Sequence, residues 1–336
     1  MRRAERAGLG SGAQTITWAI GGVNLVAEGE LGGLAQWAEP WQKAVAACQR
    51  RRGLVVEVAR MGAVPGITPV FETDGSWSFG RAEGRTCFYY RPDGAAWPHW
   101  YASLDREGRS ARLCISPRVR GTGPGMKKQE HPFCYPLSYL LVMQDVVREG
   151  GLMLHASAVR FQGKAWVFAG PTGSGKSTLA RLASRMNGIE VLSDDRVILR
   201  KCAEGWTAYG TPWAGASGLG SDGSAVLAGL FFLAKSAVNE MRRMPAPEAM
   251  RRLMTAVAIP WYESHLRDRA LASCDSLLSA VNAMELGFVP DRAAAALFMK
   301  VAALSGTGRG CGPRTRSRGS MPMPARMRGR GENQDS

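Results

Sequence analysis

Hydrophobic and polar positions alternate in short runs over residues 15 to about 120. Turn-forming groups such as Pro92-Asp93-Gly94 and Arg106-Glu107-Gly108 separate these runs, which are TCFYYRP, HWYASLD and SARLCIS. Aromatic and β-branched runs between turn formers are typical of strands, so a small antiparallel sheet is predicted. Its aromatic side chains suit either the core of that sheet or a recognition surface. A short helix is also expected over Gln36–Gln49.

The pattern changes after a Gly-rich linker at residues 121–130. Apolar residues return at helical spacing over residues 138–149, and two apolar runs then flank the tight turn Gln162-Gly163. Strands are expected over residues 190–200, 206–211 and 224–234, and helices over residues 176–186, 250–257, 271–281 and 292–303. Strands mixed with helices in this way predict the α/β fold class for the second half of the chain.

The chain therefore divides into three parts. Residues 1–125 form the β-rich region, residues 126–305 form the α/β domain, and residues 306–336 form a tail. The tail is rich in Gly, Arg, Pro and Ser and has no periodic apolar positions. Because such a segment cannot bury enough surface to offset its chain entropy, it is predicted to be disordered.

The distribution of charge along the chain bears on whether nucleic acid is a partner. The 336 residues carry a formal net charge of +15, which raises nucleic acid as a partner. The excess is spread along the chain, however, with 19 Lys and Arg against 14 Asp and Glu in residues 1–150, and 17 against 12 in residues 151–305. A diffuse excess is typical of a solvated surface, so a nucleic-acid partner is not expected.

Neither a membrane nor a disulfide framework is expected. No apolar run approaches the ~18–20 residues of a membrane-spanning helix, and the N-terminus lacks the apolar segment of a secretory signal. The seven cysteines are odd in number and form no CxxC pair, which is typical of a reducing compartment. These features predict a cytoplasmic protein.

The candidate chemistry begins in a glycine-rich loop between an apolar strand and a helix. Residues 170–177, GPTGSGKS, fit the pattern G-x-x-x-x-G-K-[ST] completely. Glycines let backbone N–H groups approach phosphate oxygens, and the start of the helix adds further donors. The lysine can reach the β- and γ-phosphates, and the serine hydroxyl suits Mg²⁺. The residues predicted to bind the nucleotide are Gly170, Pro171, Thr172, Gly173, Ser174, Gly175, Lys176, Ser177 and Thr178.

Two adjacent carboxylates, Asp194 and Asp195, follow the loop helix on the next strand pattern. Neighbouring side chains on a strand point to opposite faces, so both reach one site only if the strand ends there. In phosphoryl transfer, one carboxylate can hold Mg²⁺ while another accepts the proton of the attacking hydroxyl. A polar strand end with surface ion pairs is the alternative. His155, which precedes the loop on the antiparallel strand, is either a core histidine or a neighbour of the site.

Together, residues 154–199 resemble the HPr kinase/phosphorylase superfamily, specifically the HPr-kinase-related proteins. The shared pattern is a strand with His, a tight turn, a strand, the phosphate loop, a helix and an Asp-Asp strand. Residues 209–235 are similar, less closely, to kinases associated with peptide-modification cassettes. The resemblance implies a P-loop domain of the HPr kinase C-terminal and phosphoenolpyruvate carboxykinase-like type, with a mixed sheet. It does not cover residues 1–125.

The resemblance also implies roles for individual residues. Residues 170–178 would bind ATP, Ser177 and Asp195 would contact Mg²⁺, Asp194 would be the base for the acceptor hydroxyl, and His155 would be an active-site neighbour. The chain departs from the bacterial regulator kinases in carrying Thr178 where they carry Glu, and residues 205–241 contain no Arg. The missing Arg argues against a phosphorylase reaction and against HPr as the substrate.

The leading hypothesis is an ATP- and Mg²⁺-dependent kinase that phosphorylates a hydroxyl, Ser or Thr of a peptide or small protein. The β-rich region would help to recognise that acceptor, and the resemblance implies a homo-oligomer. The alternative is a nucleotide-binding adaptor in a peptide-modification cassette, without kinase turnover. An ABC-type ATPase is not favoured because the chain has no LSGGQ-like signature.

Overall fold

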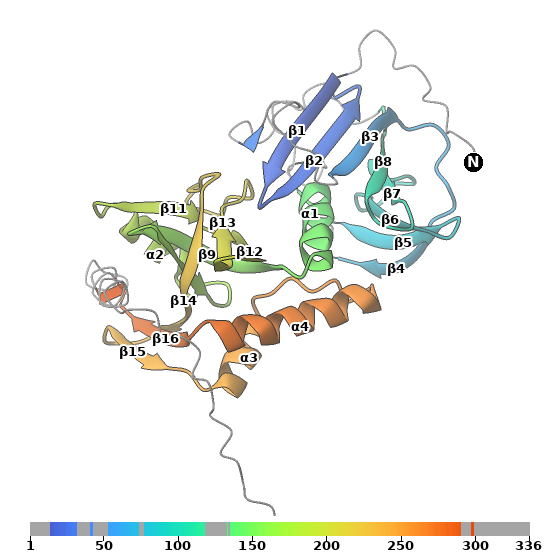
Figure 1. The fold of residues 1–336 in the computed structure, drawn as a ribbon. Coiled ribbons are helices and arrows are strands. Elements are labelled where there is room, and N and C mark those ends of the chain that lie inside the picture. Colours follow the sequence, from blue (N-terminus) through green and yellow to red (C-terminus); the bar gives the residue numbers. More distant parts are fainter. Residues whose placement is uncertain are drawn as a thin grey trace, which may run out of the picture.

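The computed structural model describes residues 14–31, 41–42, 53–73, 77–117, 133, 135–289 and 297–298. These residues form two sheets with helices packed on them (Figure 1). Several expected features lie outside the described residues: the linker, the tail, all but two positions of the helix over 36–49, and all but two positions of the helix over 292–303. They stay predictions, as do the domain limits at residues 125 and 305.

The N-terminal sheet has eight strands among the described residues, in the order β1-β2-β3-β8-β7-β6-β5-β4. They are β1 (Gln14–Ile20), β2 (Val23–Gly29), β3 (Leu54–Arg60), β4 (Thr68–Glu72), β5 (Ser78–Ala82), β6 (Arg85–Tyr90), β7 (Trp100–Leu104) and β8 (Ser110–Ile115). The three predicted runs are β6, β7 and β8, which pair antiparallel as expected. β3 instead pairs parallel to β2 and to β8, so the expectation of a purely antiparallel sheet was wrong. A parallel pair needs a long crossover, and residues 30–53 supply that length.

Most large aromatic side chains of this sheet are core residues. Trp18, Phe79, Phe88 and Trp100 are fully buried, whereas Trp97 is exposed. The helix α1 (Leu137–Arg148) covers the sheet, and most of its residues are buried. The described part of the sheet therefore favours the core over a continuous aromatic recognition surface.

The β-rich region and the α/β region share one core. The helix α1 packs against β2 and β3 and also against β9 of the second sheet. Met153 and Ile198 of the second sheet belong to the same hydrophobic cluster as Trp18. A further link is the stacking of Tyr262 on Phe79, with ring centroids 4.5 Å apart. These apolar contacts hold the N-terminal sheet beside the second sheet.

The second sheet carries the sequence motifs. Its strands are β9 (Leu152–Phe161), β10 (Lys164–Ala169), β11 (Ile189–Ser193), β12 (Arg196–Cys202), β13 (Gly205–Tyr209), β14 (Ser224–Lys235), β15 (Glu240–Arg243) and β16 (Ala283–Phe288). Their order is β10-β9-β12-β13-β14-β16-β15, with β11 on β9 and a further pairing of β10 with β14. β14 is parallel to β10 and β16, and the other pairs are antiparallel. The sheet is mixed, and the α/β class is confirmed.

Helices cover both faces of the second sheet. The helix α2 (Lys176–Ala183) packs with Val159 of β9, whereas α3 (Ala246–Met254) and α4 (Ser264–Ala280) pack with Leu154 on the opposite face. The alternation along β9 explains this arrangement, because odd and even positions of a strand point to opposite faces. In the described part of the chain, no helix combines the length and the apolar character needed to cross a bilayer.

The single strand expected over residues 190–200 is two strands, β11 and β12, interrupted at Asp194 and Asp195. The Ser193 hydroxyl accepts hydrogen bonds from the backbone N–H groups of Asp195 and Arg196. Such local side-chain bonds compete with the ladder bonds of a sheet. Both carboxylates therefore lie at a strand end, which is the arrangement that lets adjacent acids serve one site.

Candidate active site

The glycine-rich loop connects β10 to α2, which is the context that its motif requires. Gly173 and Gly175 have φ angles of +78° and +99°, a region that other residues rarely adopt. A Cβ atom on Gly170 would lie 2.6 Å from the Oγ atom of Ser174. The backbone path therefore favours glycine at 173 and 175, and glycine at 170 leaves room for the Ser174 side chain.

Ser174 shows that the loop fits an anionic ligand. Its side chain is buried, and its Oγ atom has no hydrogen-bond partner among the described residues. A buried hydroxyl without a partner is costly. No side chain caps the start of α2 either, so its N–H groups are available to an anion. These groups fit the phosphates of a nucleotide.

Lys176 and Ser177 open the loop helix. The Nζ atom of Lys176 donates to the carbonyl oxygens of Gly170 and Pro171, at 2.9 and 3.0 Å. Burial lowers the pKa of Lys176, while the nearby charges of Asp195 and Arg196 raise and lower it respectively. The Ser177 hydroxyl donates weakly to the backbone carbonyl of Asp194, at 3.5 Å, so the loop helix begins next to the acid pair.

Asp194 is fully buried and binds the loop between β13 and β14. Its Oδ1 atom accepts the N–H of Gly215 at 2.7 Å. Its Oδ2 atom accepts the N–H of Ser217 at 2.9 Å and also the Ser217 hydroxyl. A Cβ atom on Gly215 would lie 2.9 Å from the Cβ atom of Asp195, so this loop packs directly on the acid pair. Both oxygens of Asp194 are therefore used to hold the loop.

Asp195 has one oxygen engaged and one free. Its Oδ1 atom lies 3.0 Å from Nε2 of His155 and 3.1 Å from Nη1 of Arg196. Arg196 and His155 are direct partners across β12 and β9, which places both side chains beside the acid. The Oδ2 atom has no partner among the described residues, and the side chain is 28% exposed. Asp195 can therefore accept a proton or a metal ion at Oδ2.

The surroundings of Asp195 keep it ionised. Burial raises the pKa of its carboxyl group, but the hydrogen bond from His155 and the charges of Arg196, His155 and Lys176 outweigh that effect. The pKa consequently lies below its ordinary value. The histidine and the loop lysine therefore both stabilise the charged form of the Asp195 carboxylate.

The structure places the predicted residues in three settings. His155 contacts Asp195 directly, and Lys176 acts on Asp195 through its charge. Asp194 is bound by the loop at residues 215–217, and Ser177 lies beside the Asp194 carbonyl. Pro171 and Thr172 lie on the exposed outer side of the loop. The sequence reasoning missed the contributors Arg196, Gly215, Ser217 and Phe288. The sequence did contain a signal for two of them, since Arg196 adjoins the acid pair and a Gly-rich segment surrounds residue 215. Phe288 reaches the loop from β16, and no sequence pattern indicates that contact.

Phe288 makes Gly175 the most demanding glycine of the loop. A Cβ atom on Gly175 would lie 2.4 Å from Cζ of Phe288, which is itself buried, whereas a Cβ atom on Gly173 would meet open space. Gly175→Ala should therefore weaken nucleotide affinity at least tenfold, since backbone strain of about 1–3 kcal/mol is added to a steric clash. Gly173→Ala adds backbone strain without a clash, so it should lose less nucleotide affinity. Titration with a fluorescent ATP analogue measures both, and equal affinities for the two variants would contradict the clash.

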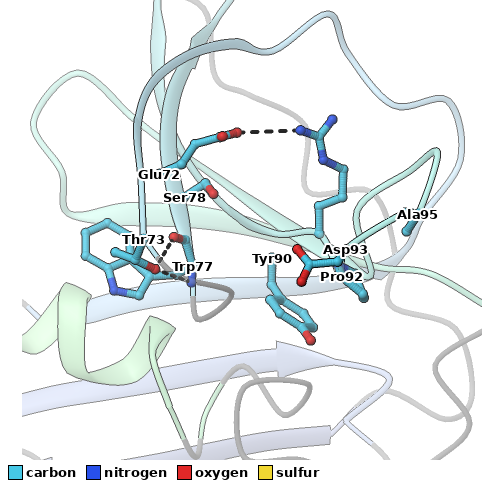
Figure 2. A pocket seen from close by; sticks show the side chains of 10 residues that line it. Glu72, Thr73, Trp77, Ser78, Tyr90, Pro92, Asp93 and Ala95 are labelled. Atoms are coloured by element: carbon cyan, nitrogen blue, oxygen red, sulfur yellow. Dashed lines mark hydrogen bonds and ion pairs between the residues drawn. The ribbon is translucent and has the colours of Figure 1, made fainter.

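A separate cavity of about 220 Å³ lies in the N-terminal sheet. Glu72 and Arg91 form an ion pair there, 3.5 Å apart. The Thr73 hydroxyl donates to the Trp77 carbonyl at 2.7 Å, and Figure 2 shows both residues at the wall of the cavity. No residue of the glycine-rich loop or of the acid pair lines this cavity. It is therefore not part of the nucleotide site, and its polar wall suits polar groups of a partner molecule.

Comparisons with known proteins add little to this geometry. No protein-family model and no curated protein matches the chain. Among solved structures, the HPr(Ser) kinase/phosphatase from Coxiella burnetii is similar, with 12% sequence identity over 45% of this chain and 88% of that chain, and a TM-score of 0.26. This is a distant likeness only, so the function is inferred from the site itself.

Proposed function

We propose that this protein is an ATP- and Mg²⁺-dependent kinase that transfers the γ-phosphoryl group to a hydroxyl, Ser or Thr of a peptide or small protein. The observation that carries this proposal is the free Oδ2 atom of Asp195, held beside His155 and in the electrostatic range of Lys176. A phosphate cradle alone would bind a nucleotide. A cradle with an ionised, partly exposed acid beside it can also activate an acceptor.

The nucleotide would be held by the residues that the motif named. The amides of the loop and of the first turn of α2, with the Ser174 hydroxyl, would bind phosphate oxygens, and Lys176 would neutralise their charge. Ser177 would supply a hydroxyl to Mg²⁺, which would take its remaining ligands from phosphates and water. Bound MgATP supplies the transferable phosphoryl group and neutralises charge on it.

The two acids would have different roles. Asp194 was expected to be the base and Asp195 a metal partner, and no observation tests that assignment. The geometry favours Asp195 as the base, because only Asp195 has a free oxygen for the acceptor proton. His155 would orient the Asp195 carboxylate through their 3.0 Å contact. Asp194 would position the loop at residues 215–217, which packs over the pair.

The acceptor is proposed to be a peptide segment because the N-terminal sheet adjoins the second sheet through α1 and Tyr262. A polar cavity in that sheet (Figure 2) offers groups that could hold a part of the acceptor distant from the reacting hydroxyl. Such remote contacts position a substrate and lower the entropic cost of reaction. We also propose that the protein forms a homo-oligomer.

Transfer of radiolabel tests the proposed function. Purified protein, Mg²⁺ and γ-labelled ATP are incubated with a degenerate Ser- and Thr-containing peptide library, and a matched library with Ala at the acceptor position serves as the control. Label is expected only in the hydroxyl-containing library and only before EDTA is added. Nucleotide binding without transfer to any peptide or small protein would favour the adaptor instead. Absence of both binding and transfer would exclude both functions.

A further inference from the structure

Arg196 has hydrogen-bonding capacity that the structure does not use. Its Nη1 atom donates to Oδ1 and to the backbone carbonyl of Asp195, at 3.1 and 3.3 Å. The guanidinium also forms a side-chain hydrogen bond with Tyr139, and the side chain is 21% exposed, so part of the guanidinium stays open to solvent. A guanidinium carries five N–H donors, so the donors on its exposed side, next to the Oδ2 atom of Asp195, are available to a ligand.

The position of this guanidinium is fixed by an aromatic platform. Its Cζ atom lies 5.6 Å from the ring centre of Tyr139. Tyr139 in turn contacts Trp213 edge-on at 5.6 Å, and the Trp213 indole donates to the hydroxyl of Ser138 at 3.1 Å. A cation packed on a supported ring loses little freedom when it binds a ligand. Arg196 is therefore preorganised rather than a mobile surface residue.

The local charge favours an anion. Arg196 and Lys176 each affect the ionisation of Asp195, and Asp195 is the only acid of the pair with a free oxygen. Asp194 is buried under the N–H groups of Gly215 and Ser217. Two cations thus share one accessible carboxylate. The planar fork of an arginine matches the two oxygens of a carboxylate.

We propose that Arg196 forms a subsite for a carboxylate of the acceptor, so that the protein selects Ser or Thr residues with an Asp or Glu close by in the peptide. This inference rests on the proposed kinase activity and adds the class of acceptor to it. Lys176 comes from the phosphate loop and serves the nucleotide, whereas Arg196 comes from β12 on the His155 side of Asp195. The nucleotide and the acceptor then each have their own cation.

A positional library tests this subsite. Wild-type protein should phosphorylate peptides with an acidic residue next to the acceptor at least tenfold better than peptides with Ala there, as a charge-assisted hydrogen bond predicts. Arg196→Gln should abolish that preference, and Arg196→Glu should shift it to Lys and Arg. The matched control is Arg200→Gln on the same strand, which contacts the Gly21 carbonyl instead and should keep the acidic preference.

Two further measurements separate the outcomes. MgATP affinity should be unchanged in Arg196→Gln, and a large loss of affinity would show that the guanidinium binds the nucleotide and would overturn the acceptor subsite. Fluorescence anisotropy then compares binding of an acidic and a basic Ser peptide to protein that holds a non-hydrolysable ATP analogue. If no transfer occurs, Arg196-dependent binding of the acidic peptide still supports the subsite while the kinase function fails. The absence of any Arg196-dependent preference in both assays overturns the subsite.

Discussion

Lys176→Ala should lose phosphoryl transfer by on the order of 10²- to 10³-fold, the cost of removing one group that stabilises charge developing at the reacting centre. The ammonium group is buried at the start of α2 and lies where the loop carbonyls of Gly170 and Pro171 converge. Alanine leaves the backbone path unchanged but removes the charge. Nucleotide affinity should fall as well, because phosphate binding relies on that charge.

Single-turnover transfer and nucleotide titration measure the two effects separately. The matched control is Lys164→Ala, which removes an exposed lysine from the start of β10 on the strand that enters the same loop. That variant should transfer and bind as the wild type does. A Lys176→Ala protein that remains folded and transfers at the wild-type rate would remove the phosphate loop from the mechanism.

The pKa of Lys176 also gives the pH dependence a sign. Burial lowers this pKa from its ordinary value of 10.5, and bound phosphates would raise it again because they favour the charged form. Between those two values, nucleotide binding takes up a proton, so affinity should fall as pH rises toward 10.5. A Lys176→Arg variant should lack this fall, since its guanidinium stays protonated. The same fall in both proteins would assign the titration to another group.

The local parts of the site could be predicted from the sequence. The glycine-rich loop is formed by eight consecutive residues, and the motif specifies the residue type needed at its key positions. His155 could be placed beside the loop because one tight turn at Gln162-Gly163 sets the pairing of β9 with β10. Short-range rules suffice when the determining contacts are close along the chain.

The rest depends on contacts between distant residues. The Asp194 carboxylate is occupied by the N–H groups of Gly215 and Ser217, and no local pattern around residue 194 indicates those partners. The parallel pairing of β3 with β8 is likewise set by a crossover rather than by alternation. The motif therefore predicts the glycine-rich loop itself, but it does not predict how the loop at residues 215–217 holds Asp194.

The contrast between the two acids determines which substitution is informative. Asp194→Asn keeps the shape of the side chain, but its NH₂ group would face either the N–H of Gly215 or the donors of Ser217. A buried donor facing another donor costs about 1–3 kcal/mol. This variant should therefore melt at a lower temperature and lose transfer through displacement of the loop, with the two losses appearing together.

Asp195→Asn should reduce transfer by on the order of 10²- to 10⁴-fold, the contribution of a general base, while nucleotide affinity and melting temperature stay near wild type. The amide oxygen can still accept from His155 and Arg196 at the Oδ1 position, so the local contacts survive. The position of Oδ2 would carry NH₂, which cannot accept the acceptor proton. Rapid-quench transfer, nucleotide titration and thermal melting of the two Asn variants decide between the roles. A stable but inactive Asp194→Asn beside an active Asp195→Asn would instead make Asp194 the base, as the family resemblance implies.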